Sequence, residues 1–181
     1  RQSELPQGLF QTLLVGSGRV ASLIDHPSVR AVTLTGSTLA GKAVAAQAGA
    51  ALKKSVLELG GSDPYVVLED ADLEPTVEAC VASRLINAGQ SCIAAKRFIV
   101  PKSIRKSFEE RFVEKMKAHR IGDPFEEGVT VGPLARRDLC DSLHAQVVKS
   151  LQKGARALLG GKLPAGEGAY YFPTVLTDVQ K

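Results

Sequence analysis

Strand and helix patterns alternate along the first third of the chain, and this alternation constrains the fold more than any other feature. Apolar segments rich in β-branched residues predict strands, and the segments between them predict helices. The expected strands are residues 10–15, 29–35 and 55–59, and the expected helices are 17–26 and 37–54. A β-α-β-α-β order is typical of parallel strands joined by crossover helices. The sequence therefore predicts an α/β fold with a parallel, doubly wound sheet.

The same kind of pattern begins again after the glycine pair Gly60-Gly61. Helices are expected at 72–85, 103–119 and 137–153, and short strands at 64–68, 97–101, 156–160 and within 170–179. The helix over 103–119 is amphipathic, because four large apolar residues recur at every fourth position. They are Ile104, Phe108, Phe112 and Met116. Two adjacent glycines let the backbone bend sharply at little steric cost, so we expect one domain over 1–59 and another over 60–181.

Composition and charge exclude several classes of protein. The 181 residues are 44% hydrophobic and 23% charged, which is typical of a soluble globular protein. The net charge of +4 is small, its lysines and arginines are dispersed, and tryptophan is absent. We therefore expect neither a nucleic-acid partner nor a membrane partner. Because the chain has no starting methionine, it reads as an internal part of a longer protein.

Three cysteines, Cys80, Cys92 and Cys140, are too few and too irregularly spaced for a disulfide framework or a zinc site. No metal is expected, and a reducing, cytoplasmic setting is the simpler interpretation. Cys80 and Cys140 lie within helical patterns, where a thiol is normally packed. Cys92 instead follows the polar loop "NAGQS", where a substrate can reach it.

Two glycine turns follow predicted strands. The first, "GSGRVA" from Gly16, matches the dinucleotide fingerprint, but the next strand ends at Thr35 without the acid that normally binds the ribose. We interpret it as an ordinary strand-to-helix turn. The second, "TGSTLAG", contains Gly36, Ser37 and Gly41 at the start of a helix, with Ser37 or Thr38 as the expected N-cap. That start could bind a phosphate through backbone N–H groups, or it could be an ordinary helix cap. Because Gly41 has no Cβ, another group could pack closely against the helix there.

Glu58 is the one charged residue of the apolar strand segment "SVLEL". A glutamate buried in such a segment is rare unless it is paired or functional, and a shielded carboxylate can serve as a general base. The alternative is a surface position on an edge strand. The spacing alone does not determine whether Glu58 and Cys92 meet in the folded protein.

Taken together, these segments resemble the aldehyde dehydrogenase superfamily. The resemblance rests on "TLTGSTLAG", "LELGGSDPYVVLEDADLE" and "NAGQSCIAAKRFIV", in this order and spacing. It continues through "GDPFEEGVTVGPLA" and "GARALLGGKLPAGEGAYYFPTVLTDV", so that it covers essentially the whole chain. Within the superfamily the likeness is to the bacterial succinate-semialdehyde type. It implies that 1–59 is part of the NAD(P)-binding domain and that 60–181 is part of the catalytic domain.

The resemblance also implies a role for each site residue. Cys92 matches the nucleophile that forms a thiohemiacetal and then a thioester, and Glu58 matches the general base that activates water. Gly36, Ser37 and Gly41 match the family's turn for the cofactor pyrophosphate, and Leu59 is expected to contact the cofactor as well. The expected cofactor is NAD or NADP, and the expected substrate is an aldehyde. The parent enzyme is expected to be a cytoplasmic homodimer or homotetramer.

The chain departs from the resemblance at the place where many succinate-semialdehyde enzymes carry an arginine that holds the substrate carboxylate. That place is Ile86, and Arg84 stands two positions away on another helix face. Family segments for the ribose and for the second oxyanion donor are not in this sequence, so we expect little turnover from the chain alone. Two rival functions stay open, a cysteine-dependent ester or thioester hydrolase and a non-catalytic module.

Overall fold

The computed structural model describes residues 6–180, and the chain divides after Gly60 into two compact units, each with its own core. Residues 1–5 and 181, at the outer ends of the two expected domains, lie outside the described residues. Among the residues that are described, no helix is long and apolar enough to cross a membrane.

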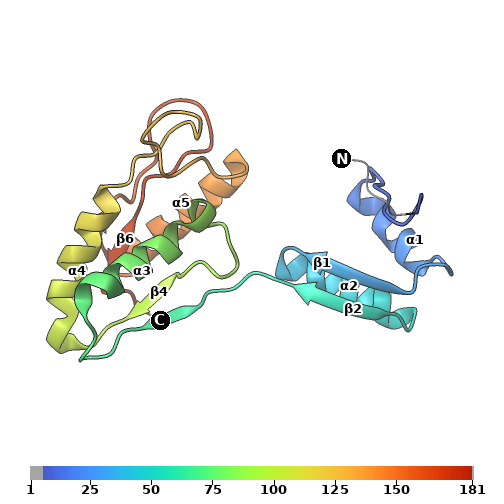
Figure 1. The fold of residues 1–181 in the computed structure, drawn as a ribbon, viewed down its shortest axis with the longest axis horizontal. Coiled ribbons are helices and arrows are strands. Elements are labelled where there is room, and N and C mark those ends of the chain that lie inside the picture. The colour runs from blue at the N-terminus through green and yellow to red at the C-terminus, as the bar shows by residue number, and fades with distance from the viewer. Residues whose placement is uncertain (1–5, 181) are drawn as a thin grey trace. The chain divides into compact units, whose positions relative to one another are not determined.

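The first unit is a pair of parallel strands covered by helices. Its elements, drawn in blue to cyan in Figure 1, are η1 (Ser17–Arg19), α1 (Val20–Asp25), β1 (Ala31–Thr35), α2 (Thr38–Ala50) and β2 (Lys54–Glu58). The register runs from Ala31 beside Lys54 to Thr35 beside Glu58. Ile24 of α1 and Val44 and Ala48 of α2 form the buried core, and half-buried strand residues such as Leu34 pack against it. The predicted β-α-β order is confirmed for this part.

The strand predicted over residues 10–15 is wrong, because these residues form no regular structure. Leu13 and Leu14 are 65% and 96% exposed, and among the described residues the sheet of the first unit consists of β1 and β2. A strand needs a partner for its backbone N–H and C=O groups. The apolar composition of this segment therefore does not suffice to make it a strand among the described residues.

Helix α2 ends at Ala50, four residues before the predicted end at 54. The chain turns at Leu52, which has a φ of 53°, and Lys54 already belongs to β2. Lys53, expected in the last turn of the helix, instead extends its ammonium group to the backbone oxygens of Ile24 and His26. This lysine therefore satisfies carbonyl groups at the end of α1, where they lack helical partners.

The second unit combines a parallel and an antiparallel strand pair with three long helices. Its elements are β3 (Pro64–Val66), α3 (Leu73–Leu85), η2 (Ile86–Gly89), β4 (Arg97–Ile99), α4 (Lys102–Lys117), α5 (Arg137–Gln152), β5 (Arg156–Leu159) and β6 (Val175–Thr177). Strands β3 and β4 are parallel, as predicted, whereas β5 and β6 are antiparallel. Within the described residues the strands form three two-stranded sheets, not one continuous doubly wound sheet.

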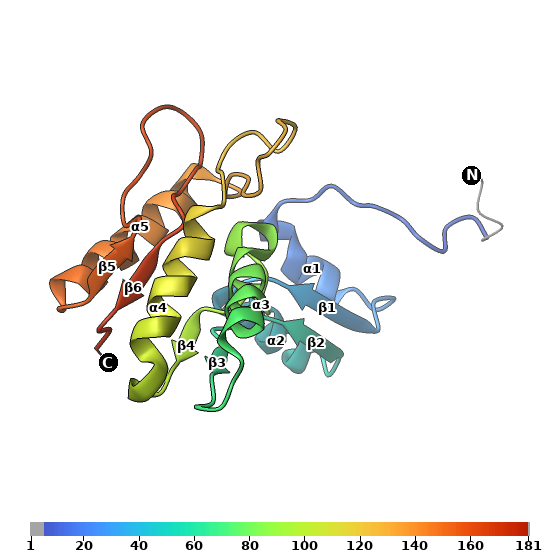
Figure 2. The same cartoon turned by 60° about the vertical axis from the view of Figure 1, so that its left-hand side comes forward.

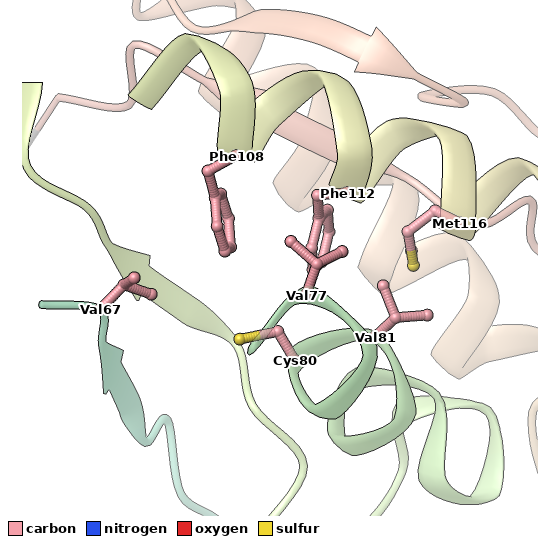
Figure 3. Close-up of a cluster of buried hydrophobic side chains, with 7 residues drawn as sticks. All are labelled: Val67, Val77, Cys80, Val81, Phe108, Phe112 and Met116. Atoms are coloured by element: carbon pink, nitrogen blue, oxygen red, sulfur yellow. The ribbon is translucent and has the colours of Figure 1, made fainter. Parts of the chain in front are cut away.

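Helices α3 and α4 lie side by side in Figures 1 and 2 and enclose the main core of the second unit. The cluster in Figure 3 contains Val67, Val77, Cys80, Val81, Phe108, Phe112 and Met116. Phe112 stacks on Phe108 with ring centroids 5.6 Å apart, and its ring lies 4.9 Å from that of Phe98. The amphipathic helix predicted from the four-residue repeat is therefore confirmed, with Ile104 only partly buried at its start.

Replacement of Phe112 by alanine is expected to lower the free energy of unfolding by about 3–5 kcal/mol, because it leaves a cavity beside two aromatic neighbours, Phe98 and Phe108. Denaturant unfolding of the full-length protein measures the effect. Phe125→Ala is the matched control, since Phe112 is 4% exposed and Phe125 is 98% exposed. The control should change stability by less than about 0.5 kcal/mol. Equal losses in the two variants would contradict the core described here.

Candidate active site

The turn between β1 and α2 lies at the carboxyl end of the parallel strand pair. The Gly36 N–H donates to the Glu58 carbonyl oxygen at 2.9 Å, which extends the strand ladder beyond Thr35. Ser37 is the N-cap of α2, and its Oγ accepts a hydrogen bond from the Ala40 N–H at 3.2 Å. Of the two caps that the sequence allowed, the structure thus has Ser37. Gly36, Ser37 and the first residue of α2 are exposed, so the positive end of this helix is open to an anion.

Gly41 is buried one turn into α2, and Leu59 packs directly against it. A Cβ added at Gly41 would lie 2.5 Å from Leu59 Cδ2, which is closer than side chains tolerate. The sequence predicted a close approach at this glycine without naming the partner. The structure identifies the partner as the protein's own Leu59, so any effect of Gly41 on a cofactor acts through the position of Leu59.

Glu58 is the last residue of β2, and its side chain is exposed. Within the first unit Glu58 therefore lies on the surface, which was the predicted alternative to a buried glutamate. Its backbone is nevertheless fixed, because its carbonyl oxygen accepts the Gly36 N–H. Glu58 at the end of β2 and the turn of Gly36 and Ser37 after β1 therefore lie at the same edge of the sheet.

Cys92 lies in a turn of the second unit in which the Ala94 N–H donates to the Ser91 carbonyl oxygen at 3.1 Å. Its thiol is free and exposed, whereas the free thiols of Cys80 and Cys140 are buried. Burial raises the pKa of both Cys80 and Cys140, which disfavours the reactive thiolate at those positions. The expected contrast between one accessible and two packed cysteines is confirmed.

The segment before Cys92 has an unusual backbone. Asn87 and Ala88 have φ values of 49° and 54°, and Gly89 follows with a φ of 80°. The left-handed region is unfavourable for residues with a Cβ and persists only where neighbouring groups stabilise it. Asn87 and Gly89 adopt this conformation readily, so it is Ala88 that is held in a conformation unfavourable for its residue type.

Three polar side chains stabilise this loop, and the sequence did not identify them as site residues. The Arg84 guanidinium donates to the backbone oxygens of Gly89 and Ala95, and the Ser83 Oγ accepts the Ala95 N–H at 3.2 Å. From within the loop, the Gln90 Oε1 accepts the Ala135 N–H at 2.8 Å. The sequence signals were a Ser-Arg pair at the end of a predicted helix and the glutamine of the polar loop "NAGQS".

Gly61 also touches the loop. A Cβ at this position would lie 3.0 Å from the Cys92 carbonyl oxygen. That distance is at the limit of ordinary contacts, so a larger residue would press on the backbone of the cysteine itself. The structure therefore explains this glycine by the close approach of the Cys92 carbonyl oxygen.

Other reactive groups of the second unit have partners away from Cys92. His119 Nδ1 lies 3.0 Å from Thr130 Oγ1, and His144 Nδ1 lies 2.9 Å from the Tyr171 hydroxyl. Neither of these two histidines is therefore engaged as the base of a cysteine–histidine pair. In residues 6–180, no group of three or more histidine, cysteine or acidic side chains could hold a metal ion.

The whole chain matches one protein family. The model of the aldehyde dehydrogenase family matches residues 1–181, which is the whole sequence. The chain belongs to the aldehyde dehydrogenase family. The resemblance seen in the sequence motifs is thereby confirmed.

Several relatives of this aldehyde dehydrogenase chain are succinate-semialdehyde dehydrogenases. It is 54% identical over 179 residues to Sad of Escherichia coli (strain K12), a succinate semialdehyde dehydrogenase whose name gives NAD(P)+ as cofactor. That match covers 99% of this chain and 39% of the relative. A succinate-semialdehyde dehydrogenase of Mycobacterium avium (strain 104), named for NADP+, is 50% identical, with 97% of this chain and 37% of the relative covered.

A solved structure agrees with the fold. The succinic semialdehyde dehydrogenase of Streptococcus pyogenes, in complex with NADP+, superimposes with a TM-score of 0.90 and 34% identity. The match covers 93% of this chain and 37% of that protein. The α/β fold of an aldehyde dehydrogenase is thereby confirmed. The chain spans well under half the length of these relatives.

Proposed function

We propose that this chain is the part of an NAD(P)-dependent aldehyde dehydrogenase that carries its nucleophile and its general base. The observation that carries the proposal is the accessible thiol of Cys92 on a loop of fixed, unfavourable geometry. Residues 1–59 would contribute to the cofactor domain and residues 60–181 to the catalytic domain. The full-length enzyme would oxidise succinate semialdehyde to its acid, as a cytoplasmic homodimer or homotetramer.

In the proposed mechanism, the Cys92 thiolate attacks the aldehyde carbon and a tetrahedral thiohemiacetal forms. The Cys92 backbone N–H stabilises the oxyanion of this intermediate. When bound, NAD(P)+ supplies the acceptor for the hydride that leaves the same carbon. The resulting thioester on Cys92 is then hydrolysed by a water from which Glu58 removes a proton, and the carboxylic acid and free thiol are released.

The residues present fit a nicotinamide dinucleotide. The exposed start of α2 at Ser37 offers backbone N–H groups and the positive end of a helix of 13 residues, which suits a pyrophosphate. Gly36 leads into that helix start, and Leu59 beside Gly41 adds apolar surface. We propose NAD or NADP as the cofactor, in line with the cofactors that the relatives are named for.

Arg84 does not serve as the carboxylate-binding arginine that Ile86 replaces. Its guanidinium already donates to Gly89 and Ala95 at 2.6 and 2.8 Å. In this proposal, the carboxylate of a semialdehyde is therefore held by groups other than Arg84. The choice of succinate semialdehyde rests on the names of the relatives.

The test of the function is the absorbance of reduced nicotinamide in the full-length protein, with NAD+ or NADP+, succinate semialdehyde and a panel of uncharged aldehydes. We expect reduced cofactor with succinate semialdehyde and a lower kcat/KM for the uncharged aldehydes. Formation of no reduced cofactor from any aldehyde would overturn the proposal. Equal kcat/KM across the panel would reject only the substrate.

A cysteine hydrolase is the second candidate, since a thioester on Cys92 could also arise from an activated ester. It predicts release of acid from an ester without any nicotinamide. The partners of His119 and His144 argue against it, because a hydrolase cysteine usually needs a neighbouring base. A non-catalytic module predicts no turnover with either type of substrate.

Replacement of Gly41 by alanine is expected to raise the KM for the cofactor about three- to tenfold, a change of about 1 kcal/mol. The added Cβ displaces Leu59, which lies 2.5 Å from it. The unfolding midpoint should change little, because alanine is favoured over glycine in a helix by about 1 kcal/mol and offsets the displacement. Steady-state kinetics and thermal unfolding measure the two effects.

Gly49→Ala is the matched control, since Gly49 lies in the same helix and nothing is within 4 Å of an added Cβ. It should stabilise the protein and leave the KM unchanged. In the variant that combines Gly41→Ala with Leu59→Ala, the clash is removed, and the Gly41 substitution should then add no further rise in KM. A rise in KM in the Gly49 variant would contradict this interpretation.

A further inference from the structure

One side chain holds both ends of the loop that carries Cys92. Arg84 Nη2 donates to the Gly89 carbonyl oxygen at 2.6 Å, and Arg84 Nη1 donates to the Ala95 carbonyl oxygen at 2.8 Å. Gly89 lies three residues before Cys92, and Ala95 lies three residues after it. Because the guanidinium is planar and rigid, the two bonds fix the separation of the two loop ends.

The neighbouring residue strengthens the same attachment. The Ser83 Oγ accepts the Ala95 N–H at 3.2 Å, and it lies 2.7 Å from the Tyr65 hydroxyl. The backbone of Ala95 is thus bonded on both sides by the last turn of α3. Ala95 is 0% exposed, so water cannot replace these bonds while the loop stays in place.

The loop needs such an external support. Asn87 and Ala88 occupy the left-handed region, which asparagine tolerates but which is unfavourable for alanine. Gly89 lets the guanidinium approach, because a Cβ there would lie 1.9 Å from Arg84 Nη2. The left-handed turn and the arginine therefore depend on each other: the turn directs the Gly89 carbonyl to Arg84, and Arg84 stabilises the turn.

The surroundings of Arg84 differ from those of an ordinary surface arginine. It is half-buried, and burial lowers the pKa of its guanidinium. Within residues 6–180 it forms no ion pair, and its partners are the two loop carbonyl oxygens. Hydrogen bonds from a charged donor are stronger than those from a neutral one. The positive charge is therefore used to fix the backbone of the loop.

We infer that Arg84 is a positioning residue for the nucleophile, which sets the place of Cys92 by bonding to the backbone on both sides of it. The inference rests on the proposed function of Cys92. It assigns Arg84 to the chemical step and not to substrate binding, because the guanidinium contacts the loop. Misplacement of a reacting group by about 1 Å can cost about a hundredfold in rate.

The test is Arg84→Met in the full-length protein, with Arg111→Met as the matched control. Arg111 is an exposed arginine that pairs with Glu74 on α3 at 2.9 Å, away from the loop. We expect kcat of the Arg84 variant to fall about 10–100-fold while both KM values stay within about twofold. The control should keep kcat. A fall in kcat/KM that comes only from KM, or an unchanged kcat, overturns the inference.

Two further variants separate positioning from loss of the fold. In Arg84→Lys, one ammonium cannot reproduce the planar pair of bonds, so kcat should lie between wild type and Arg84→Met. Arg84→Ala leaves room for a small guanidinium, and added ethylguanidine should restore part of its kcat. If Arg84→Met does not fold, the Arg84→Lys result decides: a wild-type kcat with a single ammonium overturns the inference.

The failure of the proposed function would be visible separately. If the wild type forms no reduced cofactor, amide hydrogen exchange of residues 86–95 decides the positioning role. We expect exchange at Ala95 to be at least about tenfold faster in Arg84→Met than in Arg111→Met, because that amide then opens more often. Equal exchange in both variants overturns the inference, whatever the activity.

Discussion

Replacement of Cys92 by alanine is expected to lower kcat for aldehyde oxidation by more than about 10⁴-fold, because removal of a covalent nucleophile leaves only binding and orientation. Without the thiol, neither the thiohemiacetal nor the thioester can form. The measurement is the rate of reduced-nicotinamide formation by the full-length protein at saturating aldehyde and cofactor. Thermal unfolding should be unchanged, since the side chain is exposed.

Cys140→Ala is the matched control for the loss of a thiol. Cys140 is 0% exposed, and its Sγ lies 3.1 Å from the Tyr170 carbonyl oxygen in the core of α5. This variant should lose about 1–2 kcal/mol of stability and keep its kcat. A Cys92→Ala enzyme that kept more than about a tenth of wild-type kcat would require a different nucleophile. That result would reject the mechanism proposed for this chain.

Replacement of Glu58 by glutamine is expected to lower steady-state turnover about 10²–10⁴-fold and to preserve the first turnover. The amide cannot take a proton from water, so the thioester accumulates after hydride transfer. Rapid mixing should show a burst of reduced cofactor equal to the amount of active sites, followed by a slow phase. Because Glu58 is exposed within its unit, the fold should be unaffected.

Glu69→Gln is the control, as Glu69 is also exposed but lies in the second unit, outside the proposed site. It should match the wild type in both phases. Loss of the burst in Glu58→Gln would mean that the carboxylate acts earlier, in activation of Cys92. Wild-type turnover in both phases would mean that another group is the base.

Local signals in the sequence predicted the helices of the second unit well. Asp72 was expected to begin a helix ending near Leu85, and its carboxylate caps α3 (Leu73–Leu85) by accepting the Glu74 N–H. The four-residue repeat of α4 placed Phe108 and Phe112 in the core. These predictions succeed because a helix cap and an amphipathic face are determined by residues within a few positions of one another.

Features that depend on distant residues could not be predicted in this way. The apolar residues 10–15 lack a strand partner. The antiparallel pairing of β5 with β6 depends on the path of the long loop that joins these two strands. The role of Arg84 was missed for the same reason. Its partner Ala95 is 11 residues away, and it becomes a neighbour only after the chain folds back through the turn at Asn87, Ala88 and Gly89.

The sequence indicated the residue types of the candidate site but not the contacts that hold these residues in place. Cys92 and Glu58 stood out because a polar, reactive side chain in an otherwise ordinary segment needs an explanation. The close contact between Gly41 and Leu59 could be expected only as an approach by an unnamed group. Sequence reasoning thus indicates where the chemistry could be, and the structure adds which backbone atoms are held to make it possible.

The burial of Cys80 and Cys140 determines which thiol of this chain is oxidised during storage in air. Their thiols are shielded within the core, so among the three cysteines of this chain Cys92 is the thiol that oxidants reach first. Mild peroxide would oxidise it to a sulfenic acid with release of water, and an added small thiol would condense with the sulfenic acid to a mixed disulfide; a thiol reductant reverses both. A stored preparation would then lose the proposed activity with its fold intact and regain it with dithiothreitol, until further oxidation to the sulfinic acid makes the loss permanent.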